Sequence, residues 1–430
     1  MIKINRFFKT YQGLPRSVYV IFFAQVINRF GDFVMPFLTL LLTTQFHYSV
    51  AQTGSIVMLT MILSIPGGLI GGKVADHIGR KKSYLIFQGA SGLSLMLCAF
   101  FYTHQVMLLF IFMSSFFSGA VRPILSAILS DVLKPEDRQA GFSLSYLGIN
   151  LGVALGPIVA GFLFNHFRFW IFMGDAITSF FAVALVILTI KESLPRLDEE
   201  HHSNDEQAQA HALIENDSQN SLSNMNEHEK TMEGSILDVL KKRPQLILFM
   251  LFNLFFSATY VQSGFSLPLI LNHLYAERGP QIFGSLMSTN AISVLFFTMM
   301  ITAFSKRNSA ITNIAIGGIA YVIGFGMIGL IKTLPLFFIS TLIWTLGEII
   351  MSINFGVYIT SQTPANFRAR FNAITNMSFA IGAILGTAII GIYIDHFSIT
   401  MAWPLIAVSS AIGTGGMFYL SFKDIRGLKK

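Results

Sequence analysis

Four ionisable residues lie inside long apolar stretches of this sequence, and their types suit proton or ion chemistry. Arg29 and Asp32 lie in NRFGDF, Arg122 lies in SGAVRPILS, and Glu348 lies in TLGEIIMS. A charge at the centre of a bilayer costs roughly 2.5–3.5 kcal/mol on insertion scales, so such groups normally face a protein interior or a water-filled cavity. Because Arg29 and Asp32 are three residues apart on one expected helix, they can pair. The pattern indicates either a fixed salt bridge or a site for protons and substrate.

Further polar residues at similar depth are candidates for the same cavity, and the chemistry that they suggest is binding. They are Asn150, Tyr260, Gln262 and Asn354. Asp175 lies nearer the end of its apolar stretch, and we interpret it as structural. No Ser/His/Asp, Cys/His or metal-ligand arrangement occurs at this depth, and the four histidines between residues 201 and 228 lack a fixed ligand spacing. The sequence therefore predicts no enzyme, no metal site and no cofactor.

The elements that position these residues are expected to be membrane-spanning helices. Only 12% of the 430 residues are charged and 53% are hydrophobic, with a mean hydropathy of +0.62, whereas soluble domains carry about 25% charged residues. A helix of about 20 apolar residues crosses the hydrocarbon layer. Twelve stretches meet this length: 18–45, 51–72, 83–103, 106–130, 139–164, 170–190, 245–272, 281–304, 311–331, 335–360, 371–394 and 401–422.

The basic residues fix the expected orientation of these twelve spans. The net charge is +7, which also suits nucleic-acid binding. However, only Arg168, Arg278 and Lys332 fall on one side of the expected membrane, and apart from Arg29 and Arg122 the other Lys and Arg residues fall on the opposite side. This bias predicts both termini in the cytoplasm, a lipid bilayer as the surroundings and no nucleic-acid partner. The first span follows a basic segment without a cleavage site, so we interpret it as an uncleaved helix.

The spans divide into two halves that resemble each other. GINLGVALGPIVAGFLFNHF (148–167) aligns with SFAIGAILGTAIIGIYIDHF (378–397), and the same offset aligns Gly54 with Gly284. Because six spans separate the copies, the halves are expected to be parallel repeats. Residues 191–244 are polar and contain more than half of the 22 acidic residues, which is typical of a disordered linker. Its end, GSILDVLKKRPQ, is a candidate interfacial helix. We therefore predict bundles at 1–190 and 245–430.

The strongest local motif is GGKVADHIGRKK at residues 71–82. Gly72 and Asp76 share one helix face, so Gly72 is expected to allow close approach of a neighbouring helix, and Asp76 to accept hydrogen bonds from a nearby helix N-terminus. Gly79 permits a tight turn before Arg80 and Lys81. The pattern G-x-x-x-D-x-x-G-R-K-K resembles the signature of the major facilitator superfamily (MFS) of transporters. The resemblance implies a conformational latch for the outward-facing state, with Asp131 as a partner of Arg80; a simple helix cap is the alternative for Asp131.

The fifth span carries a second motif, GVALGPIVAG. Gly152, Gly156 and Gly161 permit close helix packing, and Pro157 removes one intrahelical hydrogen bond. The run resembles the antiporter signature G-x-x-x-G-P-x-x-G-G of drug-exporting MFS members, with Ala160 in place of one glycine. The alternative is generic packing by small residues.

The intramembrane charges resemble two groups of the same family. Drug antiporters have an arginine near the position of Arg122, peptide transporters have a lysine before proline there, and both groups have a glutamate like Glu348. The run YLGINLG also resembles the fifth span of peptide transporters. The peptide-transporter motif E-x-x-E-R-F-x-Y-Y-G matches QVINRFGDF poorly, because Gln25 and Asn28 replace its glutamates.

Together these features predict an all-α membrane protein of twelve transmembrane helices in two six-helix bundles, with both termini cytoplasmic. The resemblance implies a secondary transporter that works by alternating access. We expect proton-coupled export of small amphipathic compounds, by a monomer in a bacterial inner membrane. The alternatives are proton-coupled uptake of peptides or small metabolites, and a transporter-like sensor or scaffold without flux. Protons and a small-molecule substrate are the expected partners.

Overall fold

The computed structural model describes residues 11–134, 137–190, 192 and 236–427. In these residues the chain is helical and contains no β-strand. The predicted linker between the two halves lies almost wholly outside the described residues, as do its four histidines. Of this linker only residue 192 and residues 236–244 are described, and in the second stretch the candidate interfacial segment forms the short helix α10 (Ile236–Lys242).

Two groups of long helices form the two halves. The first group is α2 (Arg16–Phe30), α3 (Val34–Thr44), α4 (Val50–Ile78), α5 (Arg80–Phe101), α6 (Met107–Val132), α7 (Arg138–His166) and α8 (Arg168–Thr189). The second group is α11 (Pro244–Tyr260), η3 (Val261–Ser263), α12 (Ser266–Tyr275), η4 (Ala276–Arg278), α13 (Gly279–Ser305), α14 (Ala310–Ile328), α15 (Leu334–Gln362), η5 (Ala365–Phe367), α16 (Arg368–His396) and α17 (Ile399–Gly427).

Within the described residues, eleven helical stretches are long and apolar enough to cross a membrane. The sequence predicted twelve. The difference arises because the longest stretch, Pro244–Ser305, has 62 residues and contains α11, α12 and α13 without a gap. The short turns η3 and η4 join these helices, so the spans predicted at 245–272 and 281–304 fall within one continuous stretch. The prediction of an all-helical membrane protein with two bundles is confirmed.

The first helix of each bundle is interrupted near its middle. Residues 31–33 separate α2 from α3, and the stretch Val261–Phe265 separates α11 from α12. The sequence predicted one uninterrupted helix over 18–45, but the break falls within NRFGDF itself. A broken helix leaves backbone N–H and C=O groups without helical partners, and such groups commonly bind ions or polar ligands inside transporters. Asp32 therefore lies in a helix break.

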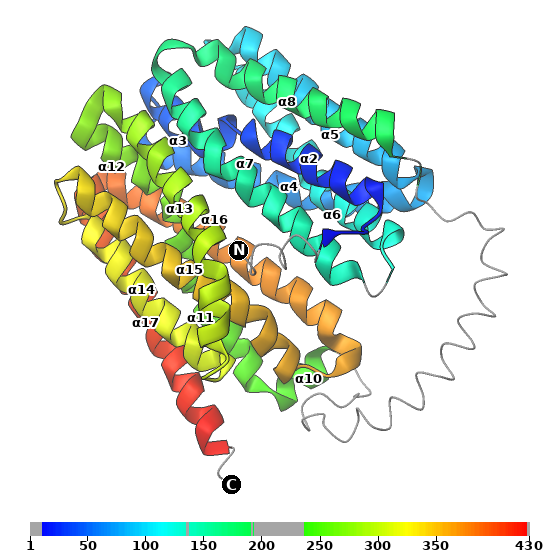
Figure 1. Cartoon of the computed structure of the whole chain (residues 1–430). Coiled ribbons are helices and arrows are strands. Elements are labelled where there is room, and N and C mark those ends of the chain that lie inside the picture. Colours follow the sequence, from blue (N-terminus) through cyan, green and yellow to red (C-terminus); the bar gives the residue numbers. More distant parts are fainter. Residues whose placement is uncertain (1–10, 135–136, 191, 193–235, 428–430) are drawn as a thin grey trace, which may run out of the picture.

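The two bundles approach each other at one end and diverge toward the other (Figure 1). We call the end with the loops around Arg80, Lys134 and Lys306 the basic end, and the opposite end the far end. Contacts between the bundles join α7 to α13, α4 to α16 and α3 to α12. The hydrogen bonds of Asp395 to the start of α4, described below, lie at the far end. The molecule is thus closed at the far end and opens toward the basic end.

Glycines at the far end let helices of the two bundles touch through their backbones. A Cβ atom at Gly284 would lie 2.0 Å from the carbonyl oxygen of Pro157, and one at Gly54 would lie 3.1 Å from that of Thr387. The internal repeat aligns Gly54 with Gly284 and Pro157 with Thr387, so the two contacts are equivalent. The closure therefore has the internal symmetry of the repeat.

A second symmetric pair of contacts lies beside the first. A Cβ atom at Gly161 would lie 2.6 Å from the carbonyl oxygen of Pro280, and one at Gly391 would lie 3.0 Å from that of Val50. The repeat aligns these positions in the same way, Gly161 with Gly391 and Val50 with Pro280. The glycines of the repeat therefore mark the surface on which the bundles meet, and the two halves use it in the same way.

Candidate functional site

A cavity of about 340 Å³ lies in the first bundle, between α2, α5, α6, α7 and α8. Arg29 and Asp32 both line it, and the Arg29 Nη1 atom donates to the Asp32 Oδ2 atom at 3.0 Å. Their side chains are 39% and 31% exposed, so this pair is accessible from the cavity. The break between α2 and α3 places Asp32 at the wall, because its backbone is no longer bound into a helix.

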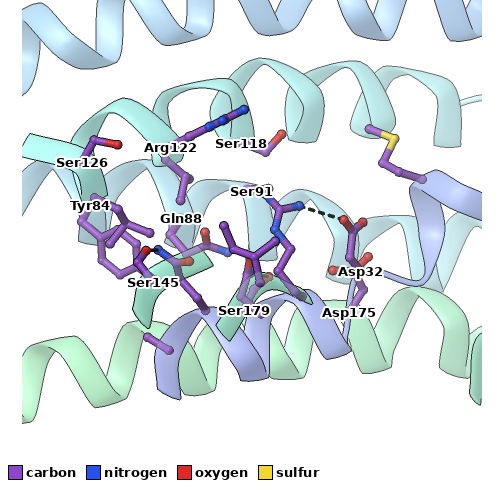
Figure 2. A pocket seen from close by; sticks show the side chains of 18 of the residues that line it. Asp32, Tyr84, Gln88, Ser91, Ser118, Arg122, Ser126, Ser145, Asp175 and Ser179 are labelled. Atoms are coloured by element: carbon purple, nitrogen blue, oxygen red, sulfur yellow. Dashed lines mark hydrogen bonds and ion pairs between the residues drawn. The ribbon is translucent and has the colours of Figure 1, made fainter. Parts of the chain in front are cut away.

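Asp175 is the residue of this cavity that sequence analysis assigned to structure alone. It lines the cavity from α8 and is 6% exposed. Its Oδ2 atom accepts the Val34 N–H group at 3.3 Å, at the start of α3. Figure 2 shows Asp175 and Asp32 at the same end of the cavity, and Asp175 lies within electrostatic range of both Asp32 and Arg29. Two carboxyl groups and one guanidinium group therefore share one end of the cavity.

The remaining wall of this cavity is rich in hydroxyl and amide groups. Gln25 donates from Nε2 to the Ser145 hydroxyl at 2.7 Å, while its Oε1 atom is buried and has no hydrogen-bond partner in the part of the chain that the structure describes. Arg122 lines the cavity from α6 and is exposed. The hydroxyl and amide side chains that line the cavity are Asn28, Tyr84, Gln88, Ser91, Ser114, Ser118, Ser126, Tyr146 and Ser179. This wall can hydrogen-bond water or a polar ligand at many points.

A second cavity, of about 250 Å³, lies in the other bundle and contains Glu348. The Glu348 carboxylate accepts the Tyr260 hydroxyl at 2.9 Å and the Asn290 amide at 2.7 Å. Tyr321 and Phe379 also line the cavity, and both rings pack against the ring of Tyr260. Asn290 did not figure among the residues predicted from the sequence. Glu348 is thus an acid held by two neutral donors beside aromatic faces.

This second cavity also has an unused acceptor. Asn253 lines it, is 2% exposed, and its Oδ1 atom has no hydrogen-bond partner among the described residues. A buried acceptor without a donor is unfavourable by about 1–3 kcal/mol. A ligand that donates hydrogen bonds would satisfy this atom.

Three polar residues of the predicted cavity lie elsewhere in the fold. Asn150 donates to the backbone carbonyl of Tyr146 within α7, and Gln262 bonds to the Ser266 hydroxyl at 2.6 Å within the break between α11 and α12. Asn354 accepts the Asn313 amide at 3.0 Å, which joins α15 to α14. These three residues do not line either cavity described above. In each case the side chain is directed to a local hydrogen-bond partner.

The motif at residues 71–82 forms an ion-pair cluster at the basic end. The Arg80 guanidinium contacts the Asp131 Oδ2 atom at 3.0 Å and the Asp76 Oδ1 atom at 3.1 Å. It also donates to the Ala75 carbonyl oxygen at 3.0 Å, and its side chain is only 14% exposed. The structure therefore brings together Arg80 and Asp131, the pair that the family resemblance implied. The cluster ties α6 to the turn between α4 and α5.

Gly72 does not make the close helix approach expected of it. A Cβ atom at Gly72 would meet nothing within 4 Å, whereas one at Gly71 would lie 2.2 Å from the Cβ atom of Ala120 and one at Gly67 would lie 1.9 Å from the Phe116 carbonyl oxygen. Gly67 and Gly71 are four residues apart, so they share the face of α4 that packs on α6. Gly72 lies one residue further along, about 100° around the helix, and faces open space here.

Gly79 ends α4 in a conformation that other residues avoid. Its φ of 106° and ψ of 150° lie in a region that is essentially restricted to glycine. A Cβ atom there would also lie 2.5 Å from Oε2 of Glu192, whose Oε1 atom accepts the Lys81 N–H group at 3.1 Å. The Lys81 side chain donates to the Ile187 carbonyl oxygen at 2.8 Å. Gly79 is therefore required both by its backbone angles and by the packing of the turn.

We expect Gly79→Ala to lower the free energy of unfolding by about 1–3 kcal/mol, because alanine is strained at this φ. Gly72→Ala is the matched control, since a methyl group there meets open space and alanine favours a helix. The measurement is the apparent melting temperature of each variant in detergent, which should fall for the first change only. Equal melting temperatures for the two variants would contradict this explanation of Gly79.

The fifth-span motif contacts two neighbours. Cβ atoms at Gly152 and Gly156 would lie 2.7 Å and 2.4 Å from the backbone oxygens of Val26 and Phe30, so this face of α7 packs on α2. Pro157 and Gly161 instead face α13 of the other bundle, through the far-end contacts described above. The motif thus links the wall of the first cavity, through α2, to the surface between the bundles.

Comparisons with known proteins give a consistent picture. The sequence profile of the Major Facilitator Superfamily matches residues 21–387. The MFS-type transporter YqjV of Bacillus subtilis is 23% identical over 393 residues, which cover 90% of this chain and 88% of that protein. A Na⁺, Li⁺, K⁺/H⁺ antiporter of Planococcus maritimus is 21% identical over 405 residues, which cover 90% of this chain and 91% of that protein.

Solved structures show the same fold. A POT family transporter in complex with a thioalcohol-conjugated peptide superposes with a TM-score of 0.77 at 16% identity, over 96% of this chain and 97% of that one. The nucleoside transporter NupG superposes with a TM-score of 0.73 at 15% identity, over 93% of this chain and 98% of that one.

Proposed function

Because this chain belongs to the major facilitator superfamily, we propose that it is a proton-coupled secondary transporter that exports small amphipathic compounds. It is an integral multi-pass membrane protein whose relatives are transporters and not enzymes. The proton-coupled and export parts of the proposal rest on the two cavities and on the resemblance to drug-exporting members. The bacterial inner membrane is the proposed location, and the monomer the proposed working unit.

The observation that carries the proposal is that two carboxyl groups share one end of the first cavity with a single guanidinium group, whereas Arg122 lines the cavity away from that end (Figure 2). Arg29 neutralises one of the two charges of Asp32 and Asp175, since a guanidinium carries a single positive charge. The remaining negative charge is unfavourable in a membrane-embedded bundle, unless a proton or a cation neutralises it. The cavity gives such a proton a path for exchange, because both Arg29 and Asp32 are partly exposed to it. Asp32 is the proposed carrier, and Arg29 modulates it.

The proposed site for the exported compound is the second cavity. Glu348 supplies a negative charge, Tyr260, Tyr321 and Phe379 supply aromatic faces, and Asn253 supplies a free acceptor. Aromatic faces and carboxylates both attract organic cations. We propose that the basic end faces the cytoplasm, as the positive-inside bias favours, which would make this state closed outside and open inside. In that state an exporter would collect its substrate.

A second candidate function is proton-coupled uptake of peptides or small zwitterionic metabolites. Arg122 in the first cavity and Glu348 in the second present opposite charges from the two bundles. A ligand with both a carboxylate and an amine would match this arrangement. The altered span-one motif, with Gln25 and Asn28, weighs against this candidate.

Counterflow in proteoliposomes distinguishes the two functions. Vesicles with an imposed pH gradient would be tested with a cationic dye, ethidium, and with a labelled dipeptide, dialanine. The proposed function predicts proton-dependent movement of the dye and no movement of the dipeptide. The reverse result would favour uptake, and the absence of movement of any substrate from a broad ligand screen would favour a sensor without flux.

A further inference from the structure

α4 and α16 touch through a carboxylate at the far end. The Asp395 carboxylate accepts the Val50 N–H group at 2.8 Å through Oδ1 and the Ala51 N–H group at 2.9 Å through Oδ2. These amides belong to the first two residues of α4, which have no helical acceptor of their own. A negative charge at a helix N-terminus is also favourable through the helix dipole. Asp395 of one bundle thus holds the start of a helix in the other bundle.

The other pair of helices at the far end carries a neutral contact at the equivalent place. The internal repeat aligns Asn165 with Asp395. Asn165 donates its amide to the Glu277 carbonyl oxygen, just before α13. Asn165 and Asp395 therefore make contacts at equivalent positions of the repeat, but only the Asp395 contact involves a charged side chain. The charged version lies between α16 and α4.

The same two helices carry a carboxylate near their opposite ends as well. α4 and α16 both have 29 residues and run antiparallel, since α4 ends and α16 begins at the basic end. Asp395 is the second residue from the end of α16, and Asp76 is the third from the end of α4. Asp76 therefore lies at the level of the first amides of α16, just as Asp395 lies at the level of the first amides of α4.

Of these two carboxylates, only that of Asp395 forms hydrogen bonds with the opposite helix in the described residues. Asp76 is 65% exposed and contacts Arg80 of its own turn, and within the described residues it has no partner on α16. The bundles diverge at the basic end (Figure 1), and there Asp76 contacts Arg80 of its own bundle. Closing the basic end requires the far end to separate, if the bundles rock as rigid bodies.

We propose that Asp395 is a positioning residue that holds the far end closed, and that it opposes the latch at the basic end that the family resemblance implies for Asp76. This inference rests on the alternating access of the proposed function, but not on any particular substrate or coupling ion. The free energy of the Asp395 contact sets the balance between the two states. Its loss should move the resting population toward the state that is open at the far end.

The test is a distance measurement in purified full-length protein, without substrate. Spin labels at Thr103→Cys and Lys332→Cys report the far end, and labels at Lys134→Cys and Lys306→Cys report the basic end, in a Cys98→Ala background. Pulsed electron resonance then gives both distance distributions. We expect Asp395→Asn to lengthen the far-end distance, shorten the basic-end distance, and shift the ratio of the states by about tenfold, or roughly 1.4 kcal/mol.

Three further variants decide the outcome. Asp395→Glu should keep the original distributions because it retains the carboxylate, and Asp76→Asn should favour the far-end-closed state. Asp76→Asn combined with Asp395→Asn should lie between the single variants. Unchanged distributions in Asp395→Asn, or the same shift in Asn165→Ala, would overturn the proposal. The distance measurement does not depend on flux. If the protein failed to move dye in the proteoliposome assay but showed these shifts in distance, the proposed function would be refuted and the Asp395 inference would stand.

Discussion

Asp32→Asn should abolish uphill transport while leaving exchange without a gradient measurable. A proton crossing 100 mV gains about 2.3 kcal/mol, which supports roughly 50-fold accumulation of substrate per proton. Asparagine fills nearly the same volume but carries no titratable proton, so accumulation should fall to about onefold. The partner Arg29 also loses its 3.0 Å ion pair. The measurement is dye accumulation in proteoliposomes with an imposed pH gradient, compared with counterflow at equal pH.

Glu277→Gln is the matched control for this change. Glu277 is also a carboxylate, but it is exposed in the turn η4 before α13 and does not line either cavity. Removing its charge should leave accumulation near the value of the unchanged protein. If Asp32→Asn accumulated dye as well as this control, Asp32 would not be the carrier, and Asp175 or Glu348 would be tested next by the same substitution to the amide.

Glu348→Gln should weaken binding of a cationic dye by about 10- to 100-fold, because a contact with a charged partner contributes roughly 1.5–3 kcal/mol and 1.4 kcal/mol is tenfold. Glutamine can still accept the Tyr260 hydroxyl, but its amide nitrogen cannot accept the Asn290 amide that now donates at 2.7 Å. The loss of charge should therefore be accompanied by rotation of the side chain. Dye fluorescence titrated against purified protein measures the affinity.

Tyr260→Phe separates the charge from its hydrogen bonds. This change removes the donor at 2.9 Å but keeps the carboxylate and the aromatic face. We expect a smaller loss of dye affinity than in Glu348→Gln, and no loss for a neutral ligand of similar size. A larger loss in Tyr260→Phe than in Glu348→Gln would mean that ring geometry, and not the charge, determines binding.

The features that sequence predicted well are those with a strong physical signature. The length of the apolar stretches predicted the helical membrane fold, and the internal repeat predicted glycines that the structure places in equivalent contacts, such as Gly161 and Gly391. The ion pair of Arg80 and Asp131 came from family resemblance, and the two residues meet at 3.0 Å.

The features that sequence did not reveal depend on helix rotation and on local breaks. A residue's position along a span gives its depth, but each step turns the side chain by about 100°. For this reason Gly72 was expected at a contact that Gly71 makes, and Asn354 was expected in a cavity although it bonds to Asn313. The helix break at residues 31–33 contains no proline that would have predicted it from the sequence. Asp175 appeared structural because its depth alone did not show that it lines the same cavity as Asp32.

The backbone contacts at the far end have a consequence for energy conservation. A carrier that is open on one side avoids leaking protons only if no continuous chain of water molecules crosses its closed side, because such a chain conducts protons. At Gly284 the Pro157 carbonyl oxygen occupies the space that a Cβ atom would need, and at Gly54 the Thr387 carbonyl oxygen and the Phe265 ring lie close to that space. A void too small for water cannot pass a proton. We therefore expect the Gly284 contact to exclude water, and under the proposed function a larger residue there would part the helices and dissipate the proton gradient.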